Sequence, residues 1–444
     1  MLSVYLCKAA RKGLSLIGRG SSLPGAITLK LDPNVLKKVT IPEKTIAVTG
    51  SNGKTSTTEL IRRLAEGAGF SVVSNSEGSN QIEGITTALL GASDGSGRVK
   101  ADVAVLESDE RFCQYTFKQI TPSAIIVGNL YRDQMTRNGH SEFVRKELKK
   151  GLPAGSRLIM NADEPVSASL ADGRDNVIWF GVEQWAFKEK EGTEHAYDDG
   201  AFCPKCHSRM TYRYRVQSHL GAYKCEGCGF ERPTPHHAVT GIDGDYFIVD
   251  GNYRVKPEAV NVMYAYNIAA AFCAGVEILG LSPEKTAELL NDIQLQNEKL
   301  KRIKDYSVGG KDITFMLCKH ENSIAYNATF ASVTDEAHGD VSIVVIVDQL
   351  SRKYVADDMS WLWDLDFAYF RRPNVKKVIF AGGFADDLAS RALFCGVDND
   401  KIITDSSLED MMQDIKDSTE GKVFVTTCFT DAPKFDALCR KENG

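Results

Sequence analysis

The amino-acid sequence predicts an α/β protein with a doubly wound, mostly parallel sheet in a large domain and a smaller α/β domain after it. From Thr45 onward, short β-branched and apolar runs alternate with helical stretches, and the alternation restarts after about Arg302. Strands that alternate with helices form parallel sheets covered on both faces. We expect an N-terminal segment at 1–40, a central domain at 41–302 with an insertion at 195–235, and a C-terminal domain at 303–444.

Composition favours a soluble, cytoplasmic, multi-domain protein. The chain has 444 residues, of which 43% are hydrophobic and 25% charged. Its 53 Lys and Arg against 59 Asp and Glu give a net charge of -6, which argues against a non-specific nucleic-acid binder. No apolar run approaches the roughly 20 residues of a membrane helix. Eleven cysteines, an odd number without a secretory signal, argue against a disulfide framework.

The basic N-terminal segment predicts an amphipathic helix. Lys8, Arg11 and Lys12 interrupt the apolar run where a signal peptide would be hydrophobic. The apolar side of this helix is expected to contain Leu2, Leu6, Ala9, Ala10 and Leu14. Packing on its own domain is the favoured interpretation, and a membrane-surface helix is the alternative.

The central domain should begin with a buried strand, 45–50, a glycine-containing loop and a helix at about 55–68. Further strands are expected at 71–75, 101–108, 124–129 and 156–163. Residues 246–255 predict a hairpin that turns at Asp250-Gly251, and 260–280 a buried, alanine-rich helix. In the second domain we expect strands at 312–317, 341–348, 376–382, 401–405 and 422–428.

The loop after the first strand has the composition of a phosphate-binding loop. Glycines let backbone N–H groups approach phosphate oxygens, and the start of a helix adds a positive dipole end. Lys54 would reach the phosphates and the Thr55 hydroxyl would bind Mg²⁺, although Val48 replaces the first glycine of the general pattern. The expected nucleotide-binding residues are Gly50, Ser51, Asn52, Gly53, Lys54, Thr55 and Ser56.

Four cysteines in the inserted segment predict a zinc ribbon. Cys203, Cys206, Cys225 and Cys228 form two C-x-x-C pairs separated by 207–224. Four thiolates suit tetrahedral Zn²⁺ and leave no open coordination position, which indicates a structural role. A redox dithiol pair is the alternative. The basic, aromatic run 210–224 could stack nucleic-acid bases, but strands of the ribbon are the simpler interpretation.

The loop variant T-G-x-N-G-K-T at 49–55 resembles the ATP-binding loop of the Mur ligase superfamily, which includes folylpolyglutamate synthases. The resemblance implies a Mur-ligase-type fold and a reaction in which ATP converts a carboxylate to an acyl phosphate that an amine attacks. It also implies Mg²⁺ binding by Glu107 and nucleotide contacts by Asn267 and Arg302. Gln134 replaces a histidine that often binds a second metal, while Asn129 and Asp133 of the same stretch are retained.

Together, the loop, the cysteine pairs and the run 360–364 (SWLWD) resemble the MurT family, the ATP-binding subunits of lipid II isoglutaminyl synthases. Only about 45 residues precede the loop, too few for the UDP-binding domain of other Mur ligases. The resemblance implies amidation of the D-glutamate α-carboxylate of lipid II, at the inner face of the membrane with transient contact to it. Ammonia would come from a GatD-like glutaminase partner, and no glutaminase signature is visible in this chain.

Asp358 occupies the place of a family aspartate that completes the partner's Cys-His pair, with Asp357 and an N-cap or surface role as alternatives. Trp361 and Trp363 could anchor the partner or belong to the core. Two other functions stay open. One is a stand-alone amide ligase that adds an amino acid, and the other is a ribbon-bearing ATPase that binds nucleic acid.

Overall fold

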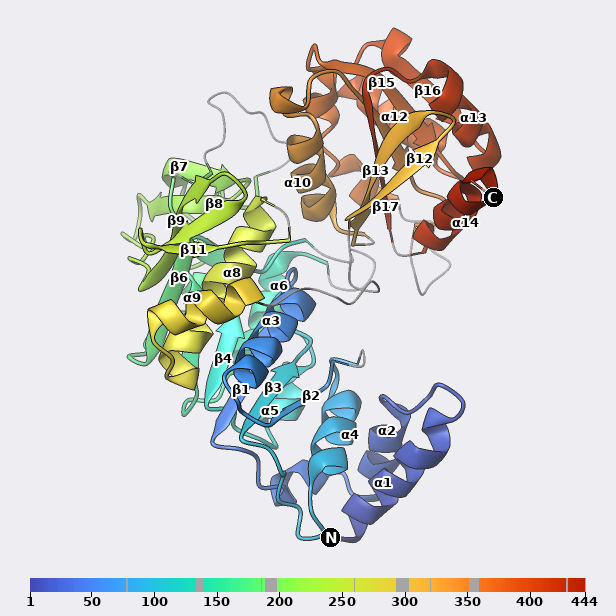
Figure 1. The fold of residues 1–444 in the computed structure, drawn as a ribbon. Coiled ribbons are helices and arrows are strands. Elements are labelled where there is room, and N and C mark those ends of the chain that lie inside the picture. Colours follow the sequence, from blue (N-terminus) through green and yellow to red (C-terminus); the bar gives the residue numbers. More distant parts are fainter. Residues whose placement is uncertain are drawn as a thin grey trace. The chain divides into compact units, whose positions relative to one another are not determined.

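The computed structural model describes residues 1–76, 79–132, 139–184, 186–187, 198–258, 260–292, 303–319, 321–350, 359–428 and 430–443. These residues form two compact units. Most of the described residues up to 292 belong to the first unit, and those from 303 onward belong to the second. Figure 1 shows the elements of both units.

A twisted, mostly parallel sheet forms the centre of the first unit. Among the described residues it has nine strands, in the order β11-β10-β9-β6-β5-β4-β1-β3-β2. All neighbours from β2 to β9 pair in parallel, and only the pairs β9–β10 and β10–β11 are antiparallel. The strands are β1 (Lys44–Thr49), β2 (Val72–Ser74), β3 (Val103–Glu107), β4 (Ala124–Val127), β5 (Arg157–Asn161), β6 (Val177–Val182), β9 (His237–Asp243), β10 (Tyr246–Val249) and β11 (Tyr253–Val255).

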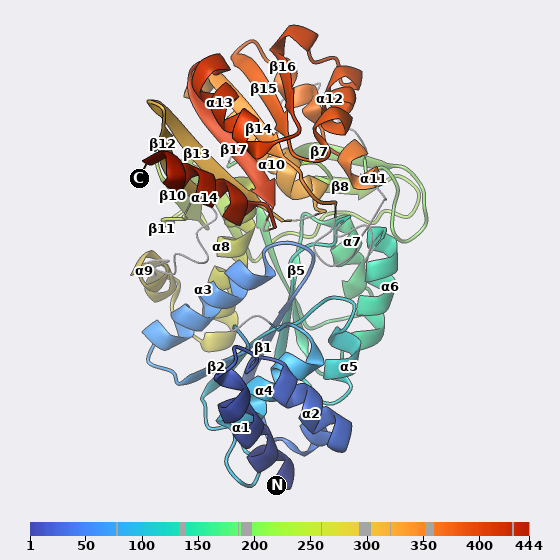
Figure 2. The same cartoon turned by 90° about the vertical axis from the view of Figure 1, so that its right-hand side faces the viewer.

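Helices cover both faces of this sheet. Figure 2 shows α3 and α8 on one side of the central strands and α5 and α6 on the other. Within the described residues the helices are α3 (Lys54–Gly67), α4 (Ile82–Ala92), α5 (Cys113–Phe117), α6 (Ser141–Gly151), α7 (Pro165–Ala168), η2 (Ser169–Ala171), α8 (Val262–Ala274), η3 (Gly275–Leu279) and α9 (Pro283–Asp292). The predicted α/β fold with a mostly parallel sheet is therefore confirmed.

The alanine-rich helix is a core element of the first unit. Val262–Leu279, which spans α8 and η3, is long and apolar enough to cross a membrane by composition alone, but 72% of it is buried inside the protein. The predicted hairpin is also present, because β10 and β11 pair across Asp250 and Gly251. Asp250 and Gly251 have positive φ values of 50° and 74°, as the two central residues of a type I′ hairpin turn require.

Three short helices at the N-terminus pack on α4. They are α1 (Leu2–Ser15), α2 (Leu23–Leu31) and η1 (Val35–Lys38). A helix at 2–15 was expected, but its predicted apolar side was wrong, because Val4 and Cys7 are buried whereas Leu2 and Ala9 are exposed. The α2–α4 contact is close: a Cβ on Gly25 would lie 1.9 Å from the Glu83 carbonyl oxygen.

The cysteine segment contributes an antiparallel hairpin to the first unit. Strands β7 (Met210–Gln217) and β8 (Leu220–Cys225) pair as a separate two-stranded sheet. Met210, Tyr223 and Cys225 are buried against Ala168 of α7. The run 210–224 therefore forms strands, and its tyrosines at 214 and 223 are buried, as the simpler interpretation expected.

The second unit is another α/β layer structure. Its described sheet has the strand order β12-β13-β17-β14-β15-β16, in which only β12–β13 is antiparallel. The strands are β12 (Ile303–Val308), β13 (Lys311–Cys318), β14 (Val341–Ile346), β15 (Val375–Ala381), β16 (Ile402–Asp405) and β17 (Lys422–Cys428). The helices are α10 (Ser323–Val333), η4 (Glu336–His338), α11 (Ser360–Trp363), η5 (Phe367–Arg371), α12 (Ala385–Phe394), η6 (Asn399–Lys401), α13 (Leu408–Ser418) and α14 (Ala432–Asn443).

Candidate functional site

The loop between β1 and α3 requires glycine at two positions. Gly50 and Gly53 have φ values of 131° and 80°. A Cβ on Gly50 would lie 2.9 Å from the carbonyl oxygen of Asn129, and a Cβ on Gly53 would lie 2.3 Å from Oδ1 of Asn267. Both positions therefore require glycine, for the backbone conformation and for the space beside Asn129 and Asn267.

Two asparagines hold this loop from either side. The Ser51 N–H donates to the Asn129 carbonyl at 2.7 Å, and the Asn52 N–H donates to Asn129 Oδ1 at 2.8 Å. On the α8 side, the Thr57 hydroxyl donates to Asn267 Oδ1 at 3.2 Å. The structure thus brings the predicted residue Asn267 to the loop. Thr55 and Ser56 lie in the first turn of α3, where backbone N–H groups have no partner within the helix.

Lys54 points into the loop and is almost fully buried. Its Nζ lies 2.9 Å from Oε2 of Glu110 and also donates to the carbonyl oxygens of Gly50 and Ser51. Glu110 is 2% exposed, so this is a buried ion pair. Glu110 belongs to none of the sequence motifs, and its only signal is its position three residues after Glu107, the last residue of β3.

Glu107 ends β3, which is the parallel neighbour of β1, so it lies at the same edge of the sheet as the loop. Its side chain is half-buried and accepts a hydrogen bond from Asn80 Nδ2 at 3.2 Å. Asn75 fixes the backbone at this position, since its Oδ1 accepts from the Glu107 N–H and its Nδ2 donates to the Glu107 carbonyl. Carboxylate and hydroxyl oxygens at this edge are the ligand types that Mg²⁺ prefers.

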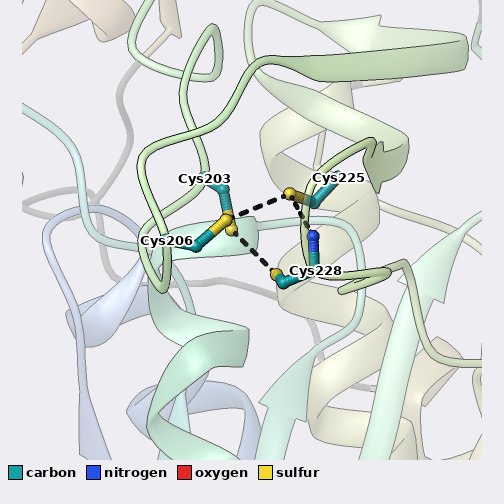
Figure 3. Close-up of side chains that lie close together, drawn as sticks. All are labelled: Cys203, Cys206, Cys225 and Cys228. Carbon is teal, nitrogen blue, oxygen red and sulfur yellow. Dashed lines mark hydrogen bonds between the residues drawn. The ribbon is translucent and has the colours of Figure 1, made fainter.

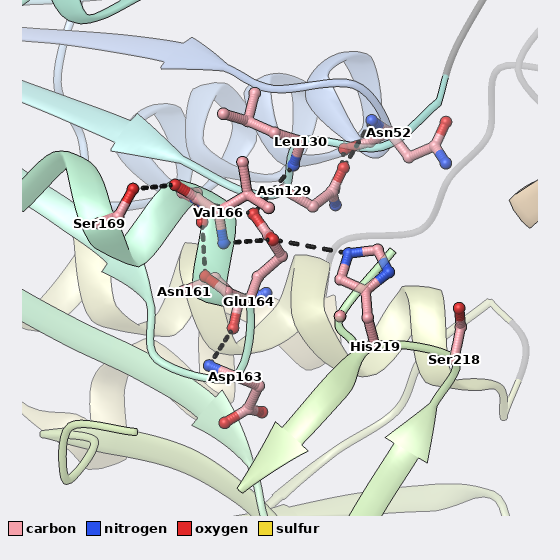
Figure 4. Close-up of polar contacts among 12 residues, drawn as sticks. Asn52, Asn129, Leu130, Asn161, Asp163, Glu164, Val166, Ser169, Ser218 and His219 are labelled. Carbon is pink, nitrogen blue, oxygen red and sulfur yellow. Dashed lines mark hydrogen bonds and ion pairs between the residues drawn. The ribbon is translucent and has the colours of Figure 1, made fainter. Parts of the chain in front are cut away.

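The turn after β5 connects the loop region with the cysteine segment (Figure 4). Glu164 is fully buried and caps α7, accepting from the N–H groups of Val166 and Ser167 at 2.8 and 2.7 Å. It also accepts from the Leu130 N–H at 3.1 Å, next to Asn129, which holds the loop between β1 and α3. On its other side, Glu164 Oε1 lies 3.5 Å from Nε2 of His219, in the β7–β8 turn.

Asp163 makes the second half of this connection. Its carboxylate accepts from the Val182 N–H at 2.7 Å, the Tyr266 hydroxyl at 2.9 Å and Arg232 Nε at 2.6 Å. Its backbone carbonyl accepts from the Gly221 N–H at 2.9 Å. Buried polar groups require such partners, so the hairpin is tied to the sheet by a satisfied polar network.

The four cysteines converge from two loops (Figure 3). Their sulfur atoms all lie within 4.8 Å of one another, and the Cys206–Cys225 and Cys203–Cys228 sulfurs are 3.4 and 3.7 Å apart. Tetrahedral zinc with Zn–S bonds of about 2.3 Å requires sulfurs about 3.8 Å apart, so the cluster fits that ion. None of the eleven cysteines, all of which lie in the described residues, forms a disulfide.

Backbone amides surround the sulfurs. The N–H groups of Gly227 and Cys228 donate to the Cys225 sulfur at 3.3 and 3.4 Å, and that of Lys205 donates to Cys203 at 3.4 Å. Such bonds stabilise thiolates and orient metal ligands. Hydrogen bonds from Ser208 also lower the pKa of Cys206 to about 6.

Other predicted residues separate into two groups. Asp133, Gln134, Arg302, Asp357 and Asp358 lie outside the described residues. The two tryptophans of α11 differ: Trp361 is 1% exposed and belongs to the core of the second unit, whereas Trp363 is 44% exposed. The Trp363 ring packs edge-on against Phe394 at 5.8 Å, and the Arg391 guanidinium lies 5.5 Å from its centroid.

Comparison with protein families matches two models to this chain. The Mur ligase middle domain matches residues 48–220, and the MurT ligase C-terminal domain matches residues 319–431. Within the first of these ranges lie the phosphate loop, Glu107 and the Asp163–Glu164 turn. The chain contains a Mur ligase middle domain followed by a MurT ligase C-terminal domain. These domains indicate an ATP-dependent ligase.

Among curated proteins, this chain is similar to two lipid II isoglutaminyl synthase (glutamine-hydrolyzing) subunits MurT. The protein of Staphylococcus aureus (strain N315) is 28% identical over 88% of this chain and 86% of its own length. That of Streptococcus pneumoniae (strain ATCC BAA-255 / R6) is 28% identical over 96% of this chain and 93% of its own length.

Solved structures show the same fold. A pseudomurein peptide ligase type C from Methanothermus fervidus has a TM-score of 0.70 at 21% identity, over 92% of this chain and 80% of its own. MurF from Acinetobacter baumannii has a TM-score of 0.61 at 14% identity, over 92% and 78%. At these identities the likeness shows a Mur ligase fold for this chain and carries no statement about its substrate.

Proposed function

We propose that this chain is the ATP-dependent synthetase subunit of a glutamine amidotransferase that amidates the D-glutamate α-carboxylate of lipid II to D-isoglutamine. The observation that carries the proposal is the similarity to MurT subunits along 88–96% of the chain. An intact strand, loop and helix with Lys54 at its start supports the same chemistry.

The proposed reaction has two steps. A carboxylate oxygen of the acceptor attacks the γ-phosphorus of ATP, ADP leaves, and an acyl phosphate forms. Ammonia then attacks the acyl carbon, phosphate leaves, and the nitrogen releases a proton to give the amide. The protein contributes by positioning the phosphates and stabilising their charge.

Lys54 performs the charge stabilisation in this proposal. In the structure it is bound to Glu110 and to loop carbonyls. When ATP binds over the start of α3, the Lys54 ammonium group leaves the carbonyl oxygens of the loop and binds phosphate oxygens instead. The buried Glu110 carboxylate, 2.9 Å from the Lys54 ammonium group, keeps that group directed into the loop.

Mg²⁺ fits beside the loop. Glu107 ends β3, and Thr55 lies in the first turn of α3, which follows the neighbouring parallel strand β1. The Glu107 carboxylate and the Thr55 hydroxyl are hard oxygen ligands. When bound, the ion neutralises charge on the phosphates of ATP. Asn267 and Asn129 hold the loop in its conformation. Arg302 contacts the nucleotide, as the family resemblance implies.

The four cysteines hold structural Zn²⁺ in this proposal, and β7–β8 is a zinc ribbon inserted in the central domain. The sulfur distances and the amide donors support zinc over a dithiol. Four ligands close the coordination sphere, so the ion would fix the two cysteine loops rather than take part in the reaction.

A GatD-like glutaminase supplies ammonia, and Asp358, or Asp357 beside it, orients the partner's catalytic histidine. The exposed Trp363–Phe394 pair supports a docking site for that partner on the second unit, which we take to be a Rossmann-like domain at 303–444. Aromatic residues beside arginine are typical interface anchors. The protein would act in the cytoplasm, at the inner face of the membrane.

The partner proposal is tested with Asp358→Asn in the complex with its glutaminase. Glutamine hydrolysis should fall sharply, because the partner's histidine loses its orienting carboxylate, while amidation with ammonium chloride should be unchanged. Asp357→Asn is the matched control. Full glutaminase activity in the Asp358 variant, with loss in the Asp357 variant, would move the role to Asp357.

The ligase proposal is tested by ADP release. Release should require both lipid II and ammonium. ADP release that requires a free amino acid instead of ammonium would favour the stand-alone ligase, in which the amino acid is the attacking amine.

A further inference from the structure

Exposed apolar side chains gather at the N-terminus of the chain. Of the large hydrophobic residues that are exposed among the described residues, six of fourteen lie within the first 31 positions. They are Leu2, Tyr5, Leu16, Ile17, Leu23 and Leu31. Leu2, Leu16 and Ile17 are 86%, 88% and 67% exposed, which is high for a group of large apolar side chains in one short segment.

Helix α1 has apolar residues on two opposite sides. Val4 and Cys7 are buried in the core shared with α4. Leu2, Tyr5 and Ala9 follow one another at helical spacing on the other side, and all three are exposed. The exposed row continues into Leu16 and Ile17 directly after the helix, so an apolar strip faces away from the unit.

The same segment carries a strong positive charge. Residues 1–40 contain seven Lys and Arg against one Asp, although the whole chain has 53 Lys and Arg against 59 Asp and Glu. Lys12, Arg19 and Lys30 are exposed. An apolar strip bordered by basic side chains is the pattern of a helix that lies in the interface of an anionic bilayer.

We propose that Leu2, Tyr5, Leu16, Ile17 and Leu31, together with Lys12, Arg19 and Lys30, form a docking surface for an anionic lipid bilayer, which we call the N-terminal lipid surface. Figures 1 and 2 both place α1 and α2 at the end of the first unit opposite β7 and β8, so the ribbon hairpin does not cover this surface. The inference deepens the proposed function and rests on it for its purpose, because a lipid-linked acceptor is held in the membrane. Its physical evidence is independent of that function.

The docking itself is measured without substrate. Full-length protein is sedimented with vesicles of phosphatidylcholine alone or with added phosphatidylglycerol. Binding should be at least ten-fold stronger with phosphatidylglycerol and should weaken with salt, since exposed basic groups contribute in a screened, additive manner. Absence of binding to the anionic vesicles would overturn the proposal, and would leave a protein partner as the occupant of the surface.

The matched variants are Leu16→Asp/Ile17→Asp and Leu393→Asp/Phe394→Asp, which introduce the same charges at exposed apolar pairs in the two units. The first should lower vesicle binding more than ten-fold, and the second should leave it unchanged. Because Leu16 and Ile17 are exposed, melting temperature should not change in the first variant. Equal vesicle binding by both variants would overturn the proposed surface.

Activity assays then separate this proposal from the proposed function. Leu16→Asp/Ile17→Asp should lose turnover on lipid II embedded in anionic vesicles and retain it on a water-soluble, short-chain lipid II analogue. If the unmodified protein converted neither substrate, the proposed function would be contradicted, but the vesicle-binding result would still stand. Equal turnover of the variant and the unmodified protein on embedded lipid II would contradict a role of the lipid surface in catalysis.

Discussion

Lys54 and Glu110 form a buried ion pair at the start of α3, and the two residues have different consequences when removed. Losing Lys54 removes the charge that we propose binds phosphate, and it also leaves a buried carboxylate without its partner. Function and stability can therefore be separated at this pair.

We predict that Lys54→Met lowers ATP turnover about 10²–10³-fold and destabilises the first unit by about 3–5 kcal/mol. The double variant Lys54→Met/Glu110→Gln should recover most of the stability and none of the turnover. Calorimetric unfolding and ADP release measure the two effects. If the double variant were no more stable than the single one, the pair would not be the source of the destabilisation.

His237 gives the first unit a stability that depends on pH. Burial opposes its charge, but the hydrogen bond and charge of Asp250, at 2.7 Å, and those of Glu277 outweigh burial and raise the pKa of His237. A raised pKa contributes stability that is fully present below the unfolded-state pKa, about 6.5, and is lost as pH rises through the folded-state pKa.

We therefore predict that the stability difference between the unmodified protein and His237→Gln is largest on the acidic side of about pH 6.5 and shrinks at alkaline pH. Denaturant unfolding of both proteins across this range is the measurement. A difference that stayed constant with pH would show that His237 contributes packing alone. His236, whose Nδ1 accepts the Trp179 N–H, serves as the neighbouring control.

At the scale of elements, the strands and the glycine-containing loop between β1 and α3 could be predicted because their signals are local. Helix α3 was expected at about 55–68 and spans Lys54–Gly67. The buried side of α1 could not be predicted from spacing, since apolar residues occur all around the helix. Packing against α4 determines which side is buried. Lys8 Nζ donates to the Ser93 carbonyl at the end of α4. Glu110 and His219 were missed because single polar residues carry no periodic signal.

Arg232 joins the β7–β8 hairpin to the turn after β5. We predict that Arg232→Met destabilises the first unit by about 3–5 kcal/mol, because Asp163 is fully buried and loses its charged partner. Lys224→Met removes an exposed pair with Glu231 in the same hairpin and should change stability by no more than about 0.5 kcal/mol. Calorimetry of both variants decides the comparison, and equal effects would contradict the network.

The cysteine cluster predicts a metal content that can be counted. Cys225→Ser should abolish bound zinc and lower the melting temperature, since it removes one of four ligands. Cys395→Ser, a half-buried cysteine outside the cluster, should retain zinc. Elemental analysis of the purified proteins provides the readout. Equal zinc in both variants, or none in the unmodified protein, would remove the metal assignment.

For the whole molecule, the family and the ligase class could be inferred from three separated motifs that agree: the loop at 49–55, the cysteine pairs and the run 360–364. The matches to the Mur ligase middle domain and to the MurT C-terminal domain are consistent with that inference. The acceptor and the partner could not be established in this way, because no local pattern positions the residues proposed to act in the partner, Asp357 and Asp358. These residues lie outside the described part of the chain.

The central claim is that this chain uses ATP to form an amide on lipid II from ammonia. The most direct measurement is mass spectrometry of lipid II after incubation with the protein, ATP, Mg²⁺ and isotopically labelled ammonium, without any glutaminase. We predict that the label appears on the stem-peptide D-glutamate, only with ATP present and not with Lys54→Met. Unlabelled lipid II, with ATP still consumed when a free amino acid is supplied, would contradict the account.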